Sequence, residues 1–196
     1  MQRSEIVELH YVAPIANVPS IIKYGILSHK LAGQLAHQSV AMLEIQERRT
    51  NKQIPGARKL HEYACLYIDA HNPMLSRLRE KNDEICVLRV DPCVLDLSHI
   101  IIADRNAAAD LVRFLPLTDG LRFIDRDRVF ARYWTHPEDL IEERRHKAEK
   151  CAEVLIPDRI EVRFIVGAYV AGERSLERFN QLDTGLPVSI NCDIFF

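Results

Sequence analysis

Residues 151–157 read Cys-Ala-Glu-Val-Leu-Ile-Pro, a short apolar run that contains one carboxylate, Glu153. A run of this length that ends in proline is typical of a buried β-strand. A carboxylate buried there without a partner costs several kcal/mol, so Glu153 needs a partner or a task. Candidate partners lie far away in the sequence, at His10 and at the arginine pair Arg48 and Arg49. Together these groups can hold a dianionic nucleotide and stabilise a developing cation.

Around this run the predicted strands and helices are mixed without a regular βαβ alternation. Strands are expected at 6–13, 61–69, 84–90, 152–156 and 161–170, with an extended segment at 95–102 that turns near Ser98. Helices are expected at 17–25, 40–50, 104–114, 125–132, 138–150 and 173–182. This mixture predicts an α+β fold and not a doubly wound parallel sheet. The chain has neither GxGxxG nor GxxxxGK[ST], so a Rossmann or P-loop nucleotide site is unsupported.

The helix expected at 17–25 has signals at both ends. Asn17 can cap the free amide groups of the first turn, and Pro19 suits that turn. Gly25 suits the left-handed residue that ends a helix. The segment is therefore expected to be a short, well-defined helix.

Length and composition predict one globular domain over residues 1–196. A chain of this length buries roughly 70% of the surface that its unfolded form exposes. Its hydrophobic content of 47% and charged content of 28% are ordinary. No apolar run approaches the roughly 20 residues that span a bilayer, and the start Met1–Glu5 lacks a signal-peptide pattern. A soluble, cytoplasmic protein without membrane contact is expected.

The cysteines and the net charge limit the classes of ligand. The five cysteines are scattered and lack CxxC spacing, so we expect no metal. The net charge is −2, so contact with nucleic acid has to come from a local basic surface. The candidate surfaces are Arg48-Arg49 with Lys52, Arg58-Lys59 and Arg144 to Lys147. Each of them taken alone is more often a solvated helix face.

A set of short segments, taken in order, carries a family resemblance. The segments are Leu9-His10-Tyr11 with Asn17 to Ser28, Ile45 to Arg49, Tyr63 to Tyr67 with Pro73-Met74-Leu75, Asn106 to Ala109, Arg132-Tyr133-Trp134, and Ala152 to Ile156. None of them is specific alone, but their order and spacing are. Over almost its whole length the chain resembles the DarT family, DNA ADP-ribosyltransferase toxins of bacterial toxin–antitoxin pairs.

The resemblance implies a fold and a reaction. The fold is a split β-sheet core of the ADP-ribosyltransferase type, with NAD in the cleft as co-substrate and no metal. A base of single-stranded DNA attacks C1″ of the nicotinamide ribose, and nicotinamide leaves. A macrodomain antitoxin of the DarG type removes the mark and blocks the toxin. Family members modify thymine or guanine, and the segment 63–67 is less aromatic here than in many of them, so the target base stays open.

The resemblance also implies roles for the charged residues. Cleavage of the ribose–nicotinamide bond passes through an oxocarbenium-like state, which a fixed carboxylate stabilises. Glu153 is expected to do this, to hold a ribose hydroxyl and to assist deprotonation of the base; the alternative is a structural glutamate paired with Arg or Lys. Arg49, or Arg48 in its place, is expected to hold a phosphate of NAD and to steer the base. The two point about 100° apart on a helix, so one is expected to face the cleft.

Five further residues are expected to contact NAD. His10 is expected to bind a ribose, and Tyr67 and Met74 to form walls of the nicotinamide pocket. Tyr11 and Asn17 complete the set. Each has an ordinary alternative: a satisfied structural histidine, core packing, or a helix cap at Asn17.

The stretch 134–150 lies where ADP-ribosyltransferases place their substrate-recognition loop. Stacking of a base on Tyr133 or Trp134 contributes roughly 1–3 kcal/mol, while cations follow the phosphates. The expected cations are Arg144, Arg145, Lys147 and Lys150. The alternative is an amphipathic solvated helix with Leu140 and Ile141 packed inward. In duplex DNA the target atom lies within the stack, so a single strand is the expected substrate.

Two rival functions stay open from the sequence. The same sheet could act on RNA ends or protein side chains, although the basic and aromatic stretch 132–150 favours nucleic acid. The chain could also be a nucleic-acid-binding or antitoxin-binding module without turnover. A pure binding module has no need of a carboxylate beside bound phosphates, so Glu153 and Arg49 argue against it.

Overall fold

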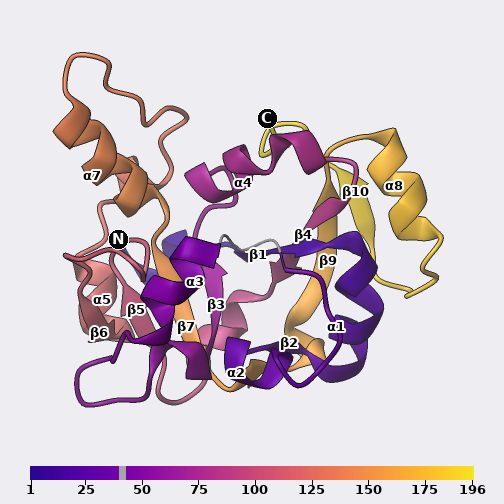
Figure 1. The fold of residues 1–196 in the computed structure, drawn as a ribbon, viewed down its shortest axis with the longest axis horizontal. Helices are drawn as coiled ribbons and strands as arrows, with labels where there is room; N and C mark the ends of the chain where they lie inside the picture. The colour runs from indigo at the N-terminus through magenta and orange to yellow at the C-terminus, as the bar shows by residue number, and fades with distance from the viewer. Residues whose placement is uncertain (40–42) are drawn as a thin grey trace.

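The structure, a computed structural model, describes residues 1–39 and 43–196 and is built around one eight-stranded sheet (Figure 1). In their order across the sheet the strands are β10 (Val188–Ile190), β9 (Ile165–Val170), β4 (Ile85–Val90), β1 (Leu9–Pro14), β3 (Tyr63–Tyr67), β7 (Glu153–Pro157), β5 (Ile101–Ala103) and β6 (Phe114–Pro116). A small second sheet pairs β2 (Ile26–Leu27) with β8 (Arg159–Ile160). The run that contains Glu153 is thus an inner strand of the main sheet, with neighbours on both edges.

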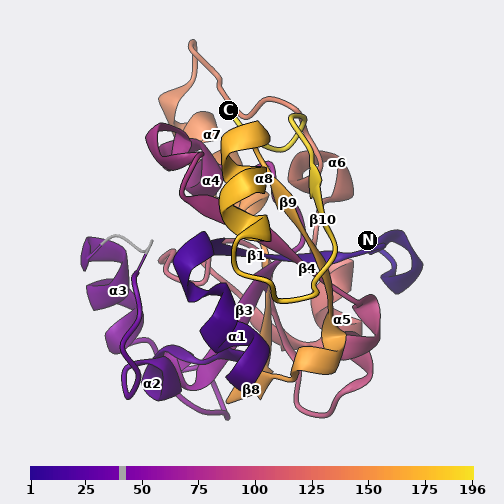
Figure 2. The same ribbon diagram turned by 90° about the vertical axis from the view of Figure 1, so that its right-hand side faces the viewer.

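Helices lie on both faces of this sheet. They are α1 (Val18–Tyr24), α2 (His29–Ala32), α3 (Leu43–Thr50), α4 (Pro73–Arg77), α5 (Leu117–Arg122), α6 (Arg126–Val129), α7 (Leu140–Lys150) and α8 (Glu173–Asn180). Figure 2 shows α2, α3 and α4 on one side of the sheet and α5 and α6 on the other. No helix among the described residues has the length and apolar character needed to cross a bilayer.

The sheet is split between β1 and β3. Strand β1 pairs with β4 from Leu9 to Pro14, but with β3 the described register is the single pair His10 and Tyr67. Strand β3 in turn pairs with β7 along its whole length. Two four-stranded halves therefore meet at one point and diverge beyond it. The expected α+β fold with a split sheet is confirmed.

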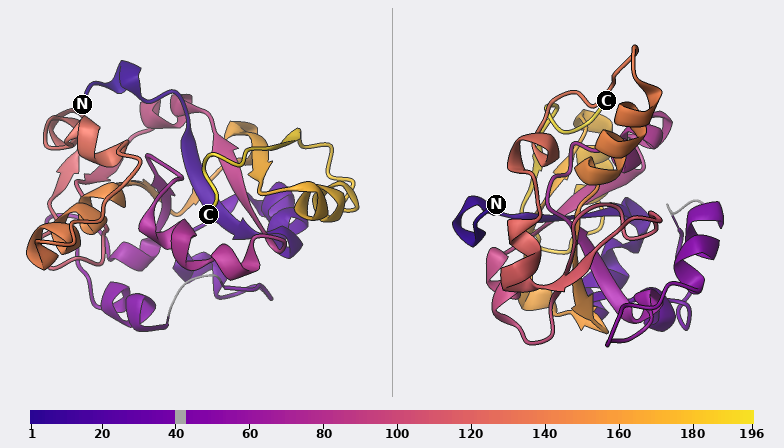
Figure 3. Two further views of the ribbon diagram at one scale, coloured as in Figure 1. Left: turned by 90° about the horizontal axis from the view of Figure 1, so that it is seen from above. Right: turned by 90° about the vertical axis from the view of Figure 1, so that its left-hand side faces the viewer.

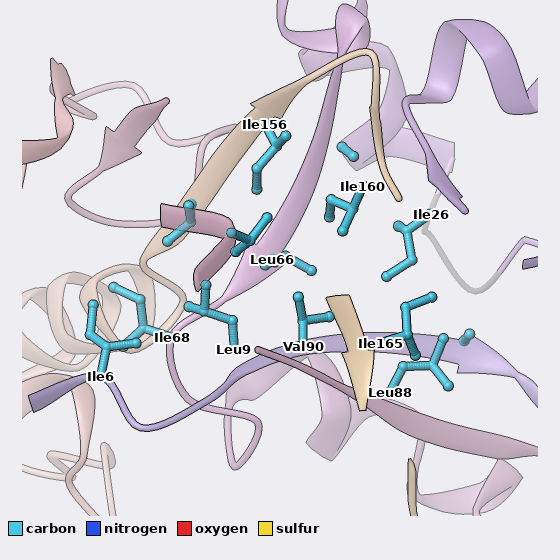
Figure 4. Packing of buried hydrophobic residues seen from close by; sticks show 14 of the residues in the cluster. Ile6, Leu9, Ile26, Leu66, Ile68, Leu88, Val90, Ile156, Ile160 and Ile165 are labelled. Carbon is cyan, nitrogen blue, oxygen red and sulfur yellow. The ribbon is translucent and has the colours of Figure 1, made fainter. Parts of the chain in front are cut away.

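The main hydrophobic core lies on the face of the sheet away from α2, α3 and α4. Figure 4 shows isoleucine, leucine and valine side chains from both halves of the sheet converging there, among them Leu9, Leu66, Leu88 and Ile156. Gly25 ends α1 with φ of +84°, and a Cβ there would lie 2.2 Å from the carbonyl oxygen of Ile160. Glycine is required at this position for both reasons.

The expected strands and most of the expected helices are present, with two corrections. No helix forms over 104–114; instead the N–H of Arg113 donates to Asp104 (2.9 Å) and the N–H of Ala108 to Asn106 (2.8 Å). Such side chain–backbone bonds compete with a helix. The second correction concerns residues 95–96, within a 3₁₀ turn over 92–96, and residues 162–164, also a 3₁₀ turn; extended chain was expected at both places. The helix expected at 40–50 is α3, and residues 40–42 lie outside the described residues.

Candidate active site

A cavity of about 940 Å³ opens on the face of the split sheet that α2, α3 and α4 flank. Its walls come from β1, β3, β7, α2, α3, α4, the C-terminal half of α7 and the segments 106–109, 132–135 and 195–196. The volume is near the upper end of the roughly 300–1,000 Å³ typical of small-molecule sites. These segments are far apart in the chain, so the cavity exists only in the folded protein.

The guanidinium of Arg49 and the carboxylate of Glu153 form a two-point ion pair in this cavity. Arg49 Nη1 donates to Glu153 Oε1 (3.2 Å), and Nη2 donates to Oε2 (2.8 Å). Nη2 also lies 3.0 Å from the sulfur of Cys65 on β3. The side chains are 11% and 2% exposed, respectively. A buried carboxylate on an inner strand thus has the partner that its burial requires.

A third donor to Glu153 comes from the loop that was expected to be a helix. The backbone N–H of Ala107 donates to Glu153 Oε1 at 2.8 Å. Asn106 shapes this loop, because its side chain accepts from Ala108 N (2.8 Å) while its own N–H donates to Ala148 O (2.8 Å). Sequence reasoning missed Ala107, since a backbone amide leaves no residue-type signal.

Burial and the ion pair together set the protonation of the groups in the cavity. Burial alone lowers the pKa of Arg49, but the Glu153 carboxylate outweighs burial and raises it above the usual range. Burial raises the pKa of Cys65 to about 12, although Arg49 opposes the shift. Burial and then Glu153 raise the pKa of Tyr67 well above its ordinary value. Arg49 is therefore a permanent cation, while the nearby thiol and phenol stay neutral at physiological pH.

Arg48 also lines the cavity, but in a different setting from Arg49. Its side chain is exposed, and among the described residues it has no ion-pair partner. The expectation that one of the two arginines faces the cleft is therefore wrong. Both do, with Arg49 held by Glu153 and Arg48 free at the solvent-exposed part of the wall.

His10 lies beside the cavity and is absent from its described wall. It sits opposite Tyr67 at the one register pair that joins the two halves of the sheet. Its Nε2 is 3.1 Å from Glu8, which also accepts from Arg89 (2.8 Å). Burial alone raises the pKa of Glu8, but His10 and Arg89 outweigh it and lower that pKa to about 2. Nδ1 of His10 is buried and has no partner among the described residues.

The other expected NAD contacts, Tyr11, Asn17, Tyr67 and Met74, all line the cavity. Asn17 is not a side-chain cap of α1. Its amide instead donates to the backbone oxygen of Gln38 (2.7 Å) and accepts from the N–H of Gln38 (3.1 Å). Asn17 thus fixes the segment that follows α2 as part of the cavity wall.

Four histidines that the sequence did not single out also line the cavity, and two of them are in contact. The rings of His29 on α2 and His61 before β3 lie 4.1 Å apart. Burial, then His29 and Arg49, lower the pKa of His61 to about 4. Burial also lowers the pKa of His29. Both rings are therefore neutral at physiological pH. Their contact joins two segments that are distant in the sequence, so no local sequence pattern could have identified them.

The segment before α7 carries Tyr133 and Trp134, which both line the cavity. Tyr133 is 78% exposed, whereas Trp134 is buried against His71, with ring centroids 5.5 Å apart. Nε2 of His136 lies 2.9 Å from Nδ1 of His146 on α7, and Nε2 of His146 lies 3.1 Å from the carbonyl oxygen of Arg128. Tyr133 thus offers a free ring, while Trp134 is part of the packing.

The expected DNA-binding cations differ in what they can reach. Lys150 is fully buried, forms an ion pair with Asp69 and donates to Val129 O (2.5 Å), so its assignment to DNA is wrong. Arg145 pairs with Glu149 (3.1 Å) and Lys147 with Glu143 (2.5 Å), each one turn away on α7. Arg144 is exposed and has no ion-pair partner among the described residues.

The outer surface of α7 differs from the solvated, inward-packed helix that was the alternative for this stretch. The alternative reading of this stretch packed Leu140 and Ile141 inward, but both are largely exposed at the N-terminal end of the helix. In Figure 1 this helix and the segment before it project from one end of the molecule. Within residues 1–39 and 43–196, no group of three or more His, Cys, Asp or Glu side chains is placed to hold a metal ion.

Comparison with known proteins agrees with this geometry. A sequence model of the DarT family, described as ssDNA thymidine ADP-ribosyltransferase, matches residues 10–196. The chain is 30% identical over 200 residues to a DNA ADP-ribosyl transferase–DNA ADP-ribosyl glycohydrolase fusion protein of Thermosipho africanus. That match covers 96% of this chain and 49% of the fusion protein, so the chain spans about half the length of this relative.

Solved structures match along nearly the whole chain. Thermosipho africanus DarTG in complex with ADP-ribose has a TM-score of 0.85 and 26% identity, covering 96% of this chain and 51% of that one. Thermus sp. 2.9 DarT shares the fold at 21% identity in complex with ADP-ribosylated ssDNA (TM-score 0.81, 98% and 97% covered). Its complex with NAD⁺ has a TM-score of 0.75 at 19% identity, with 98% of both chains covered. The chain therefore belongs to the DarT family of ssDNA ADP-ribosyltransferases.

Proposed function

We propose that this chain, working as one domain over residues 1–196, transfers ADP-ribose from NAD to a base of single-stranded DNA and releases nicotinamide. The observation that carries the proposal is the buried pair of Arg49 and Glu153 in a cavity large enough for a dinucleotide. Family membership supports it, as does the ADP-ribose in the Thermosipho africanus structure. The Thermus sp. 2.9 protein of the same fold is described with NAD⁺.

In this proposal NAD is a co-substrate that fits the charges of the cavity. Arg48, which is exposed and unpaired among the described residues, is available for a phosphate of the diphosphate. Tyr67 and Met74 provide apolar wall for the nicotinamide end, and Tyr11 and the segment fixed by Asn17 complete the wall. His10 lies beside this wall, where the sheet is split. To contact a ribose, its ring has to turn away from Glu8.

Glu153 is the proposed catalytic carboxylate. As the nicotinamide–ribose bond breaks, positive charge grows on the sugar, and a carboxylate held in place stabilises that state more than the ground state. Arg49 and the N–H of Ala107 hold the carboxylate from two sides, so it has little freedom to turn away. The base then bonds to C1″, its displaced proton leaves, and Glu153 is placed to accept it.

The proposed acceptor is a base in a single strand, reached through the segment that carries Tyr133. The exposed ring can stack on a base, and Arg144 can follow the backbone phosphates. Thymine is the first choice for the base, because the family description names thymidine. Guanine is the alternative.

We further propose that the chain acts as the toxin of a toxin–antitoxin pair, with a macrodomain glycohydrolase of the DarG type as its partner. The Thermosipho africanus relative, described as a fusion with a DNA ADP-ribosyl glycohydrolase, supports this. A base modification that blocks the DNA template needs an activity that removes it.

The test is mass analysis of single-stranded oligonucleotides incubated with NAD. A panel in which thymine or guanine is the single candidate base reports both turnover and base identity. The expected product carries one ADP-ribose on thymine. Glu153→Gln is expected to reduce the rate by about 10²–10³-fold, whereas Glu177→Gln on the exposed face of α8 is the matched control and is expected to act like the parent.

Two results would contradict the proposal. Nicotinamide release by Glu153→Gln at the parent rate removes the carboxylate from the mechanism. Modification of RNA or of protein side chains in place of the oligonucleotides assigns the fold to another acceptor.

A further inference from the structure

Three aromatic rings from distant parts of the chain form a cluster on the cavity wall. The ring of Phe196 stacks on His71 with centroids 4.3 Å apart and an interplanar angle of 18°. Phe196 also meets Trp134 edge-on at 5.7 Å and 71°. His71 and Trp134 are buried, but Phe196 stays 41% exposed while lining the cavity. One side of its ring is therefore covered by protein, and a substantial part of it is left open.

The position of this ring is held firmly. Asn82 donates to the backbone oxygen of Phe196 (2.8 Å), and Arg132 donates to that of Asp193 (2.7 Å). The two ring nitrogens of His71 each lie 3.2 Å from a backbone oxygen, one of Ile194 and one of Arg132. The last residues of the chain are thus tied to both the segment before α4 and the segment before α7. Figures 1 and 3 show this end of the chain beside α4.

We propose that Phe196, supported from behind by His71 and Trp134, is a stacking platform for the nucleobase next to the one that is modified. The inference rests on the proposed function, because it assigns part of the same cavity to the DNA strand. An exposed aromatic ring held rigid at a cavity needs no ordering when a base arrives, so the full stacking energy is available for binding.

The surroundings favour a nucleic-acid strand as the ligand. Tyr133, 78% exposed, and the cation Arg132 directly precede Trp134 in the chain and line the same cavity. Exposed aromatic rings beside a cation suit a nucleic-acid strand, because its bases stack on the rings while the cation neutralises a phosphate. The catalytic pair lies elsewhere on the wall, on α3 and β7, so the platform can hold a neighbouring base while the target base reaches Glu153.

His71 supports the platform in a further way. Burial lowers its pKa, so the ring is mainly neutral at physiological pH and carries no charge beneath the stacked base. A neutral support under an aromatic ring favours a neutral planar ligand over a phosphate. A neutral imidazole carries one N–H, so His71 donates to one of the two backbone oxygens that lie 3.2 Å from its ring nitrogens, and this bond holds the ring in the plane that Phe196 covers.

The experiment compares Phe196→Ala with Phe196→Tyr, which keeps the ring, and with Phe123→Ala. Phe123 is an exposed phenylalanine at the end of α5, on the opposite side of the sheet. Steady-state rates are measured with single-stranded oligonucleotides and NAD. Phe196→Ala is expected to raise KM for DNA by about tenfold and to leave KM for NAD unchanged. Phe196→Tyr and Phe123→Ala are expected to behave like the parent protein.

A second arm uses oligonucleotides with an abasic site on one side of the target base. With the abasic site on the side of the target base that stacks on Phe196, KM of the parent protein for DNA is expected to rise by about the same tenfold. KM of Phe196→Ala for DNA is expected to rise no further with this abasic oligonucleotide, because the ring and the base form a single contact that the substitution has already removed. If the abasic site weakens Phe196→Ala as much as the parent, the platform is wrong. If Phe196→Ala raises KM for NAD and not for DNA, the ring serves the dinucleotide and the proposal is overturned.

Binding provides a readout that does not need turnover. Trp134 is the single tryptophan of the chain and packs against Phe196, so its fluorescence reports a base on the platform. Oligonucleotide titration is expected to change this fluorescence in the parent protein and in Phe196→Tyr, with affinity about tenfold weaker in Phe196→Ala. Equal affinities in all three proteins reject the platform. If the affinities differ as expected but no base is modified, the proposed reaction is rejected and the stacking platform stands.

Discussion

Arg49 and Glu153 are 104 residues apart in the chain and meet through two parallel hydrogen bonds, of 3.2 and 2.8 Å. A third bond from the Ala107 amide reaches the same carboxylate (2.8 Å). This geometry gives Arg49 a positioning role toward Glu153 before any substrate arrives. The expectation that Arg49 binds a phosphate therefore shifts to Arg48, whose side chain is exposed and without an ion-pair partner among the described residues.

Arg49→Lys tests the two-point pair. Lysine keeps the charge but cannot present two parallel N–H bonds to a carboxylate. We expect the free energy of unfolding to fall by about 1–3 kcal/mol, which is less than the loss for a buried pair that loses one charge entirely. We expect kcat to fall by about tenfold or more, because Glu153 loses its fixed orientation. Urea unfolding and nicotinamide release measure the two effects, and a parent-like kcat contradicts the positioning role.

Arg48→Gln tests the phosphate contact. The side chain is exposed, so its loss is expected to leave the melting temperature within error of the parent. KM for NAD is expected to rise by about tenfold, since a charge-assisted bond to a phosphate contributes more than a neutral one. Steady-state kinetics with NAD as the varied substrate measures this. The neighbouring exposed Glu47→Gln is the control, and an unchanged KM for Arg48→Gln rules out the contact.

Asn106→Ala tests the loop that brings Ala107 to Glu153. The substitution removes the acceptor for Ala108 N–H, and a small displacement of the loop moves a donor away from the carboxylate. We expect kcat to fall by about tenfold, up to the roughly 10²-fold associated with a 1 Å misplacement, while both KM values hold. Asn106→Asp keeps an oxygen for Ala108 and is expected to recover most of the rate. Equal rates for Asn106→Ala and the parent contradict the role of the loop.

Lys150→Met and Arg144→Ala separate a structural cation from a DNA-binding one. Lys150 is buried and forms an ion pair with Asp69. Lys150→Met leaves that carboxylate without its cation, so the free energy of unfolding is expected to fall by about 3–5 kcal/mol. Arg144→Ala is expected to leave stability unchanged and to reduce the salt dependence of DNA binding by roughly one unit of slope. Oligonucleotide binding at several salt concentrations measures this. If Lys150→Met reduces the slope and Arg144→Ala does not, the two assignments are reversed.

The histidine pair predicts a pH dependence of stability. The pKa of His61 is lowered to about 4 in the folded protein, so between its ordinary pKa near 6.5 and pH 4 the unfolded chain takes up a proton that the folded chain refuses. Stability is therefore expected to fall as pH decreases from 6.5 to 4. His61→Asn is expected to flatten this part of a plot of melting temperature against pH. His99→Asn, at an exposed position, is the control and is expected to keep the parent slope.

Much of the framework was open to prediction because it depends on local patterns. The apolar run 153–157 forms the expected strand, and the helices expected at 138–150 and 173–182 are α7 and α8. Glu153 could be singled out because a carboxylate in a buried strand is costly wherever the strand lies. The helix expected over 104–114 failed for a local reason as well, since Asp104 and Asn106 bind the backbone of their own loop.

What the sequence by itself determined about this protein is thus the strands β1, β3, β4, β7 and β9, the pairing need of Glu153 and the segments shared with the DarT family. Only the tertiary structure decided that Lys150 is buried while Arg144 is exposed, that the N–H of Ala107 reaches Glu153, and that His71 and Phe196 line the cavity. The physical reason is the range of the interactions. Strand and helix preferences act over a few neighbouring residues, whereas burial and hydrogen-bond partners are set by contacts between segments tens to more than a hundred residues apart.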